Sequence, residues 1–291
     1  MQRLTYYILR VFIFLFSLIP FRLLYWLSDG LRFLFYYVIK YRYKVIKSNL
    51  ELAFPEKSAE EIQQLIWGAY GNLCDVLFEG IKGLSLSGTE CIRRYKILNP
   101  ELLDDIYDSK RSVFIVACHY GNWEWGPQAT GLQIQHHTLG ITAPIKNPHV
   151  NHYIQGSRVF EKVSTVVMKN TAQAFEDFKD RLTAYVFIMD QSPSNTKRAH
   201  WVDFLGQKTA CLHGADYYSR KTGYPVVFGE QQRVKRGFYE ITLHLLEDHP
   251  EHCAEGEITD LYMEKLEEII LRKPENWLWS HRRWKHRFVD V

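Results

Sequence analysis

The chain has 291 residues, of which 46% are hydrophobic and 24% charged, so it can bury a sizeable core and is not a disordered protein. Its five cysteines are an odd number without a CxxC pair, which argues against a disulfide framework or a zinc ribbon and favours a reducing compartment. Aromatic residues make up 15% of the chain, which predicts contact with something partly apolar.

The first 47 residues differ from the rest in charge. They contain eight cations and the single anion Asp29, a net charge of +7 in a chain whose total is +3. The same segment holds 14 aromatic residues. Cations mixed with aromatic rings at this density are typical of a segment attracted to an anionic membrane surface.

The apolar part of this segment is short. The uncharged run 11–21 has eleven residues, whereas a helix that spans a bilayer needs about 20. Pro20 interrupts it, and a second amphipathic helix is expected toward Tyr43. We therefore expect residues 1–47 to form an uncleaved helical membrane anchor, spanning the bilayer or lying in its interface, ahead of a catalytic domain at 48–291. A buried pair of helices is the alternative.

The rest of the chain predicts an α/β fold. A capping box from Ser58 to Glu61, followed by periodic apolar residues, predicts a helix over 59–82. From residue 112, β-rich runs alternate with helical stretches, which favours a mixed sheet flanked by helices with ligands at the strand ends. Strands are expected at 112–118, 138–142, 164–168, 185–189, 225–229 and 239–245, and helices near 122–131, 148–161, 171–181, 213–222 and 256–272.

The sharpest local feature runs from Val113 to Glu124. A strand delivers His119 at its carboxyl end, Gly121 permits a tight turn, and Glu124 falls in the first turn of the next helix. The carboxylate can then hold one ring nitrogen of His119 while the other nitrogen acts as a base. On residue types alone, a core histidine beside a chance carboxylate is the alternative.

This pattern and the blocks around it resemble the lysophospholipid acyltransferase superfamily and, within it, the late acyltransferases of lipid A synthesis, the lauroyl and myristoyl type. The resemblance covers residues 34–288, nearly the whole chain. Besides His119 to Glu124, its blocks in this sequence are 49–58, 144–148, 190–191, 204–206, Gly214, 222–227 and 274–285.

The resemblance implies an enzyme at the cytoplasmic face of the bacterial inner membrane. It moves a fatty acyl chain from acyl carrier protein, or from coenzyme A, to a hydroxyl of a lipid A precursor, and it needs no cofactor or metal beyond that thioester. His119 would deprotonate the hydroxyl, Glu124 would orient the imidazole, and no acyl-enzyme would form. Backbone N–H groups near Asn122, or a cation, would stabilise the oxyanion.

Four further residues are candidates for substrate binding. Lys146 is expected to stand in for a basic residue that the family often has before Pro144, where this chain has Ala143. Arg158 falls where the family keeps an Arg-x-Arg cluster and is expected to bind acceptor phosphate. Asp190 and Gln191 end a buried strand, the usual place for ligand contacts. The alternatives are solvated cations and loop capping.

Other features carry less chemistry. Cys118 should point away from His119, because adjacent strand residues face opposite sides, and is expected to be a buried inert thiol. Trp277 and Trp279 are expected to pack on the core, and the arginines of 282–287 are expected to line a phosphate-bearing substrate site or the lipid surface. No nucleic-acid partner is expected. Acylation of another lipid (an aminolipid or lysophospholipid) and a non-catalytic membrane-binding protein remain the competing readings.

Overall fold

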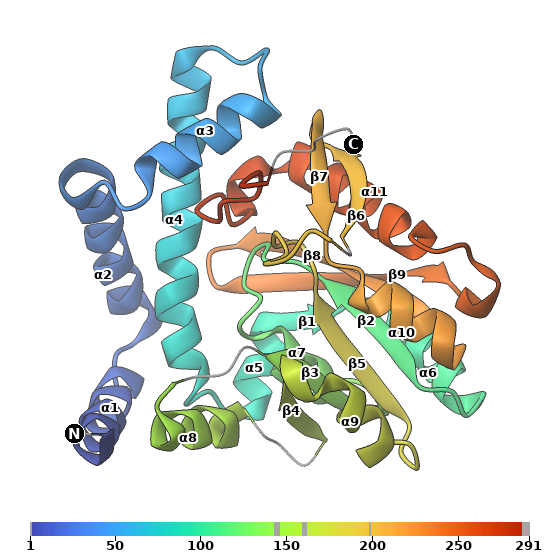
Figure 1. Cartoon of the computed structure of the whole chain (residues 1–291). Helices are drawn as coiled ribbons and strands as arrows, with labels where there is room; N and C mark the ends of the chain where they lie inside the picture. The colour runs from blue at the N-terminus through green and yellow to red at the C-terminus, as the bar shows by residue number, and fades with distance from the viewer. Residues whose placement is uncertain (1, 143–145, 159–161, 198, 287–291) are drawn as a thin grey trace.

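A computed structural model of the chain describes residues 2–142, 146–158, 162–197 and 199–286. Its centre is a seven-stranded sheet in the order β1-β9-β8-β2-β5-β3-β4 (Figure 1). The strand pairs are parallel except for the antiparallel pair β8 and β9. The mixed α/β sheet predicted from the sequence is thereby confirmed. Its strands are β1 (Tyr95–Ile97), β2 (Val113–Ala117), β3 (His137–Thr142), β4 (Val163–Val167), β5 (Thr183–Ile188), β8 (Val226–Lys235) and β9 (Phe238–Glu247).

Helices cover both faces of the sheet, and β2 contributes alternate side chains to each. Phe114 and Val116 join one apolar core, whereas Val113 and Ile115 join the other. The first core is completed by α3 (Tyr43–Ala53), α4 (Ala59–Gly83), α9 (Thr171–Asp177), α10 (Gly214–Thr222) and α11 (Glu257–Arg272). The second is completed by α5 (Gly88–Arg94), α6 (Glu101–Asp108) and α7 (Gly126–Gly131).

The N-terminal helices lie along the outer side of α4 (Figure 1). Helix α1 (Gln2–Ser17) ends before Pro20, as expected, and α2 (Phe21–Phe33) continues as the π-helix η1 (Leu34–Ile39). Helix α4 begins with the predicted capping box, in which Ser58 accepts from the Glu61 N–H and Glu61 accepts from the Ser58 N–H. The α1, α2 and η1 surface leaves large apolar side chains exposed, with Trp26 78% and Val38 66% accessible.

No helix among the described residues is by itself long and apolar enough to cross a membrane, although the bent pair Arg3–Ser17 and Phe21–Ile39 meets the length and composition criteria jointly. The helix axis bends by 117° between the two halves of that pair. Separation of 1–47 from 48–291 as two units stays a prediction.

Several elements differ from the expectations. The helix expected from residue 122 begins only at Gly126, because 121–125 form a turn. Strand β8 extends to Lys235 and pairs with β9 in a long hairpin. The sequence did not suggest β1, or the separate hairpin of β6 (His200–Phe204) and β7 (Gln207–Cys211). Helix α8 (Pro148–Arg158) lies where a helix was expected.

Candidate active site

The site begins at a tight turn after β2. Gly121 has φ +59°, and a Cβ there would lie 2.1 Å from the Gln231 Nε2 atom, so both conformation and space require glycine. The C-terminal segment fastens this turn: Gly121 N–H donates to the Asn276 carbonyl (2.9 Å), and Leu278 N–H donates to the His119 carbonyl (3.0 Å). The backbone carrying His119 is therefore held from both sides.

Asp190, and not Glu124, holds the imidazole of His119. Asp190 Oδ1 lies 2.6 Å from His119 Nδ1, and Asp190 Oδ2 accepts from the His119 backbone N–H at 2.9 Å. The cause is sheet register: β2 and β5 are parallel neighbours with Ala117 opposite Ile188, so the residues two places beyond each end stand level. We expected Glu124 to hold a ring nitrogen of His119; in the structure Asp190 contacts Nδ1 instead.

Asp190 is itself held and shielded. Only 2% of it is exposed, and Trp277 Nε1 donates to its Oδ2 at 2.8 Å. Each polar contact of the carboxylate is therefore made by a donor, which favours the ionised form. These contacts use both oxygens inside the core and hold the His119 ring, whereas the expected role of Asp190 in binding substrate stays a prediction.

Opposing effects set the charge of the pair. Burial alone would lower the pKa of His119, but the charge of Asp190 and its hydrogen bond outweigh this, with a further contribution from Glu124, and the pKa is raised. Burial likewise opposes ionisation of Asp190, yet the charge and hydrogen bonds of His119 and the indole of Trp277 lower the Asp190 pKa. The second ring nitrogen, Nε2, is 3.3 Å from the Gln191 Nε2 atom.

His119, Glu124 and Gln191 line a pocket of about 400 Å³, whose remaining lining is mainly apolar. A smaller cavity of about 40 Å³ shares four of its lining residues and lies between β2, β8 and α7. Gln128 also lines the larger pocket; it is 6% exposed, and its Nε2 has no hydrogen-bond partner among the described residues. A buried amide without a partner is rare in proteins and marks a group that a ligand can satisfy. The pocket's apolar residues include Pro127, Ile141, Val163, Met168, Val186, Ile188 and Leu212.

The other predicted site residues lie elsewhere. Asn122 is fully buried; its Nδ2 donates to Glu79 Oε2 and its Oδ1 accepts from the Trp125 N–H, so its side chain fixes the turn and does not reach the pocket. Lys146 is exposed on the loop before α8 and does not line the described pocket. Arg158 is the last residue of α8, and its side chain lies outside the described part of the chain.

Sequence reasoning missed Glu79, the centre of a buried polar network beneath the turn. Its carboxylate accepts from Tyr25 of α2 (2.8 Å), Tyr239 of β9 (2.7 Å) and Asn122 (2.7 Å), and its carbonyl accepts from the Trp125 indole (2.8 Å). Burial raises the pKa of Glu79. The available signal was a pair of acidic residues, Asp75 and Glu79, one turn apart within the periodic apolar stretch of a predicted helix. The network ties the N-terminal helices to the turn that carries His119.

The structure agrees with the expectations for Cys118 and the two tryptophans but differs for Arg283. Cys118 is 4% exposed, and burial raises its thiol pKa, which agrees with an inert core residue. The tryptophans Trp277 and Trp279 are buried as expected. Arg283 was expected near phosphate or lipid; it is instead 2% exposed and donates to the Ala210 carbonyl at 2.6 Å.

Comparison with known proteins identifies the family of the chain. Residues 1–286 match the family described as bacterial lipid A biosynthesis acyltransferase. The chain belongs to this family. It is 24% identical to the lipid A biosynthesis lauroyltransferase of Escherichia coli (strain K12) over 92% of its own length and 87% of the relative.

Two further relatives match the chain at a similar identity and coverage. The chain is 25% identical to the lipid A biosynthesis palmitoleoyltransferase of Escherichia coli (strain K12), and 25% identical to the lipid A biosynthesis acyltransferase of Shigella flexneri. Each match covers 86% of this chain and 81% of the relative. The family resemblance drawn from the sequence is thereby confirmed, and this member of the lipid A biosynthesis acyltransferase family is an enzyme that transfers acyl groups.

Proposed function

We propose that the chain transfers a fatty acyl group from an acyl thioester, carried by acyl carrier protein or coenzyme A, to a hydroxyl of a lipid A precursor. One observation carries this assignment: His119 is fixed through Nδ1 by a buried carboxylate and lines an apolar pocket that also contains Gln191 and Glu124. A histidine held in this way presents Nε2 as a base.

The reaction follows from the tautomer that Asp190 favours. The Nδ1–H of His119 donates to Asp190, so the Nε2 lone pair is free to accept the proton of the acceptor hydroxyl once that hydroxyl replaces the weakly held Gln191 amide. The alkoxide attacks the thioester carbonyl, and the tetrahedral intermediate expels the thiolate. The Nε2 proton then passes to that thiolate, which returns the histidine to its neutral form.

Charge and polarity in the pocket support the same direction of transfer. The imidazolium formed during the reaction is stabilised by Asp190 in contact and by Glu124 at longer range. Gln128 contributes an amide to the pocket, and a rotation about its terminal bond presents the NH₂ group to the carbonyl oxygen of the donor. The apolar walls built by β3, β4 and β5 suit the fatty chain.

We further propose that the enzyme works at the cytoplasmic face of the bacterial inner membrane. The exposed apolar surface of α1, α2 and η1 is large for a soluble surface, and its side chains include Phe12, Phe14, Leu18 and Trp26. Each large side chain buried in the acyl boundary contributes about 1.5 to 3 kcal/mol. The eight cations of residues 1–47 add attraction to anionic lipid.

The direct test of the reaction measures the products of acyl transfer. His119→Ala should lower transfer from an acyl thioester to a purified lipid A precursor by on the order of 10²- to 10⁴-fold while the protein stays folded. Lipid mass spectrometry of cells with and without the gene should show one missing acyl chain on lipid A. Normal transfer by a folded His119→Ala enzyme would remove the mechanism. A missing chain on an aminolipid or lysophospholipid would replace the acceptor.

Deletion of residues 1–28 tests the anchor. The truncated protein should move from the membrane fraction to the soluble fraction and lose more activity on membrane-embedded acceptor than on detergent-dispersed acceptor. Sedimentation with membranes at the level of the full chain would place the anchor outside this segment.

A further inference from the structure

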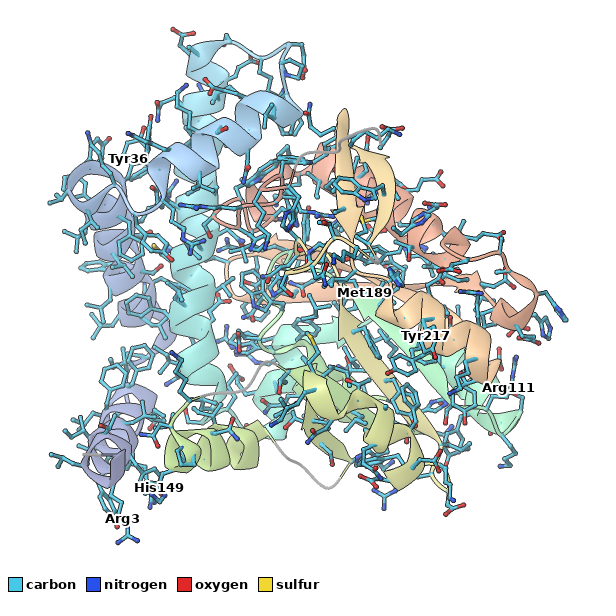
Figure 2. The ribbon with its side chains drawn as sticks, viewed as in Figure 1. Arg3, Tyr36, Arg111, His149, Met189 and Tyr217 are labelled. Carbon is cyan, nitrogen blue, oxygen red and sulfur yellow. The ribbon has the colours of Figure 1, made fainter. Side chains whose placement is uncertain are left out.

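Another cavity, which shares no lining residue with the His119 pocket, lies where η1 meets α3 and the C-terminal loop. It has a volume of about 800 Å³, and we call it the tyrosine–cation groove. Figure 2 shows Tyr36 of this groove on the outer side of α4, with Met189, which precedes Asp190, on the other side of that helix. The groove is lined by Tyr36, Tyr37, Lys40, Arg42, Tyr43, Lys44, Val45, Gln63 and Arg282.

The groove carries one sign of charge. Four of its nine lining residues are cations, and no carboxylate of the described residues is among the nine. Within the part of the chain that the structure describes, none of the four makes an ion pair. By contrast, Lys47, which lies on α3 with Lys44, is paired with Glu51. Unpaired cations gathered around a concave surface repel one another and create a positive potential that attracts an anion. Their grouping therefore requires an explanation beyond solubility.

The backbone of the groove is unusual. The chain passes from the π-helix η1 through Lys40 and Arg42, both of which have φ 51° although neither is glycine. Residues with side chains adopt this left-handed conformation rarely, and π-helical turns occur frequently at functional sites. Arg42 is also fixed by its donation to the Ser280 carbonyl at 2.9 Å. The Arg42–Ser280 contact therefore joins the cations of residues 40–44 to Arg282 of the C-terminal loop in one groove.

The aromatic walls are fixed before any ligand arrives. Tyr43 donates to Gln63 Oε1 (3.0 Å), and the Gln63 amide donates to the Tyr36 hydroxyl. The rings of Tyr36 and Tyr37 lie 4.6 Å apart, edge to face. Tyrosine rings beside cations are typical of the level of lipid headgroups, where one end of the ring is apolar and the other is wet.

The groove is continuous with the exposed apolar surface of the N-terminal helices. Tyr37 lines it and is 56% exposed, and the next two residues, Val38 and Ile39, are 66% and 54% exposed. A ligand with its charge in the groove can therefore lay an apolar tail over η1. An acidic protein surface would match the charge but would leave these aliphatic side chains without a complementary partner.

We propose that the tyrosine–cation groove is a binding site for the headgroup of an anionic phospholipid, separate from the acyl-transfer site. The phosphate lies among Lys40, Lys44 and Arg282, and the acyl chains follow the exposed face of η1. The site deepens the proposed membrane association, on which it rests, by giving it a defined lipid chemistry and location.

The test uses the full-length protein in a nonionic detergent, titrated with short-chain phosphatidylglycerol below its micelle concentration by calorimetry. The variant combines Lys40→Gln, Lys44→Gln and Arg282→Gln. The matched control, Lys96→Gln with Lys110→Gln and Lys221→Gln, removes the same charge at exposed positions outside both the groove and residues 1–47. We expect saturable binding that the groove variant weakens roughly tenfold or more, while the control stays within about twofold of the wild type.

Three outcomes would overturn the proposal. Equal binding of short-chain phosphatidylcholine would remove the anionic selectivity, and equal binding of inorganic phosphate would reduce the groove to a phosphate site. Loss of acyl carrier protein binding in the groove variant, with lipid binding intact, would assign the groove to an acidic protein. Sedimentation of the wild-type protein with membranes, measured in parallel, separates the two proposals, because lipid selectivity without sedimentation would contradict the proposed membrane association alone.

Discussion

Replacing Asp190 by asparagine separates a histidine-orienting role from a structural one. All three groups that contact the carboxylate are donors: the His119 backbone N–H, its Nδ1–H and the Trp277 indole N–H. An amide has only one acceptor oxygen. If that oxygen keeps the backbone and indole donors, the NH₂ group faces Nδ1. The imidazole must then accept there and carry its proton on Nε2, where a base needs a lone pair.

The expected loss of rate is large because the wrong tautomer cannot accept the substrate proton. General-base catalysis contributes on the order of 10²- to 10⁴-fold, which corresponds to about 2.7 to 5.4 kcal/mol of transition-state free energy. The pH profile should move as well. In the wild type, Asp190 raises the His119 pKa, so kcat/KM should fall on the acidic side with a midpoint above the ordinary histidine value of about 6.5.

The direction in which the His119 pKa shifts in Asp190→Asn follows from the interactions that the variant keeps. Burial of His119 still lowers its pKa, while the charge and hydrogen bond of Asp190 are gone and only the smaller contribution of Glu124 still raises it. The acidic midpoint of the residual kcat/KM should therefore move to lower pH. The assay follows acyl transfer to detergent-dispersed lipid A precursor across pH, with thermal unfolding as the check on folding. Asp180→Asn, the same change at an exposed position, is the control. A folded Asp190→Asn enzyme with near-normal kcat/KM and an unmoved acidic limb would refute the reasoning.

Four further substitutions test the site. Gln128→Leu should lower kcat/KM at least about tenfold while leaving the unfolding temperature equal or higher, because it removes a buried amide nitrogen that has no described hydrogen-bond partner; lower stability together with lower activity would make the residue structural. Gly140→Leu should shift selection in a mixture of acyl thioesters toward shorter chains, because Gly140 lines the pocket and has room for a Cβ 3.7 Å from Pro127; unchanged selection would move the fatty chain elsewhere. Glu79→Ala should destabilise the fold by several kcal/mol, since the two buried donors of Asn122 and Tyr239 each lose a partner at about 1 to 3 kcal/mol and the part-buried Tyr25 hydroxyl loses its partner as well, as measured by denaturant unfolding against the exposed control Glu60→Ala. Cys118→Ala should keep most of its transfer activity, and an acyl group found on Cys118 by intact-protein mass spectrometry would contradict direct transfer.

Local chemistry made part of this protein readable from its sequence. The Ser58 to Glu61 capping box predicted the start of α4 because both halves of the box lie within one helical turn. The apolar run before His119 predicted β2, and Gly121 predicted the turn, which its positive φ confirms. The family was also readable, because its motifs depend on residue types in order along the chain.

Tertiary structure alone decided the partner of the histidine. Glu124 is five residues from His119 and was the natural candidate, whereas Asp190 is 71 residues away and becomes its neighbour only through the register of β2 on β5. Trp277 reaches the same carboxylate from the C-terminal segment. A strand's own sequence specifies which of its side chains are buried, but not which strand lies beside it.

The same distinction explains the tyrosine–cation groove and the Glu79 network. The sequence marked residues 1–47 as cationic and aromatic, since these properties are additive along a chain. Arg282 joins Lys40 and Lys44 only because the C-terminal loop packs against the start of α3, and Glu79 meets Tyr25, Asn122 and Tyr239 only because α4 lies between α2 and the sheet. Such contacts join residues that are distant in sequence, and only packing of the whole chain brings them within hydrogen-bonding distance.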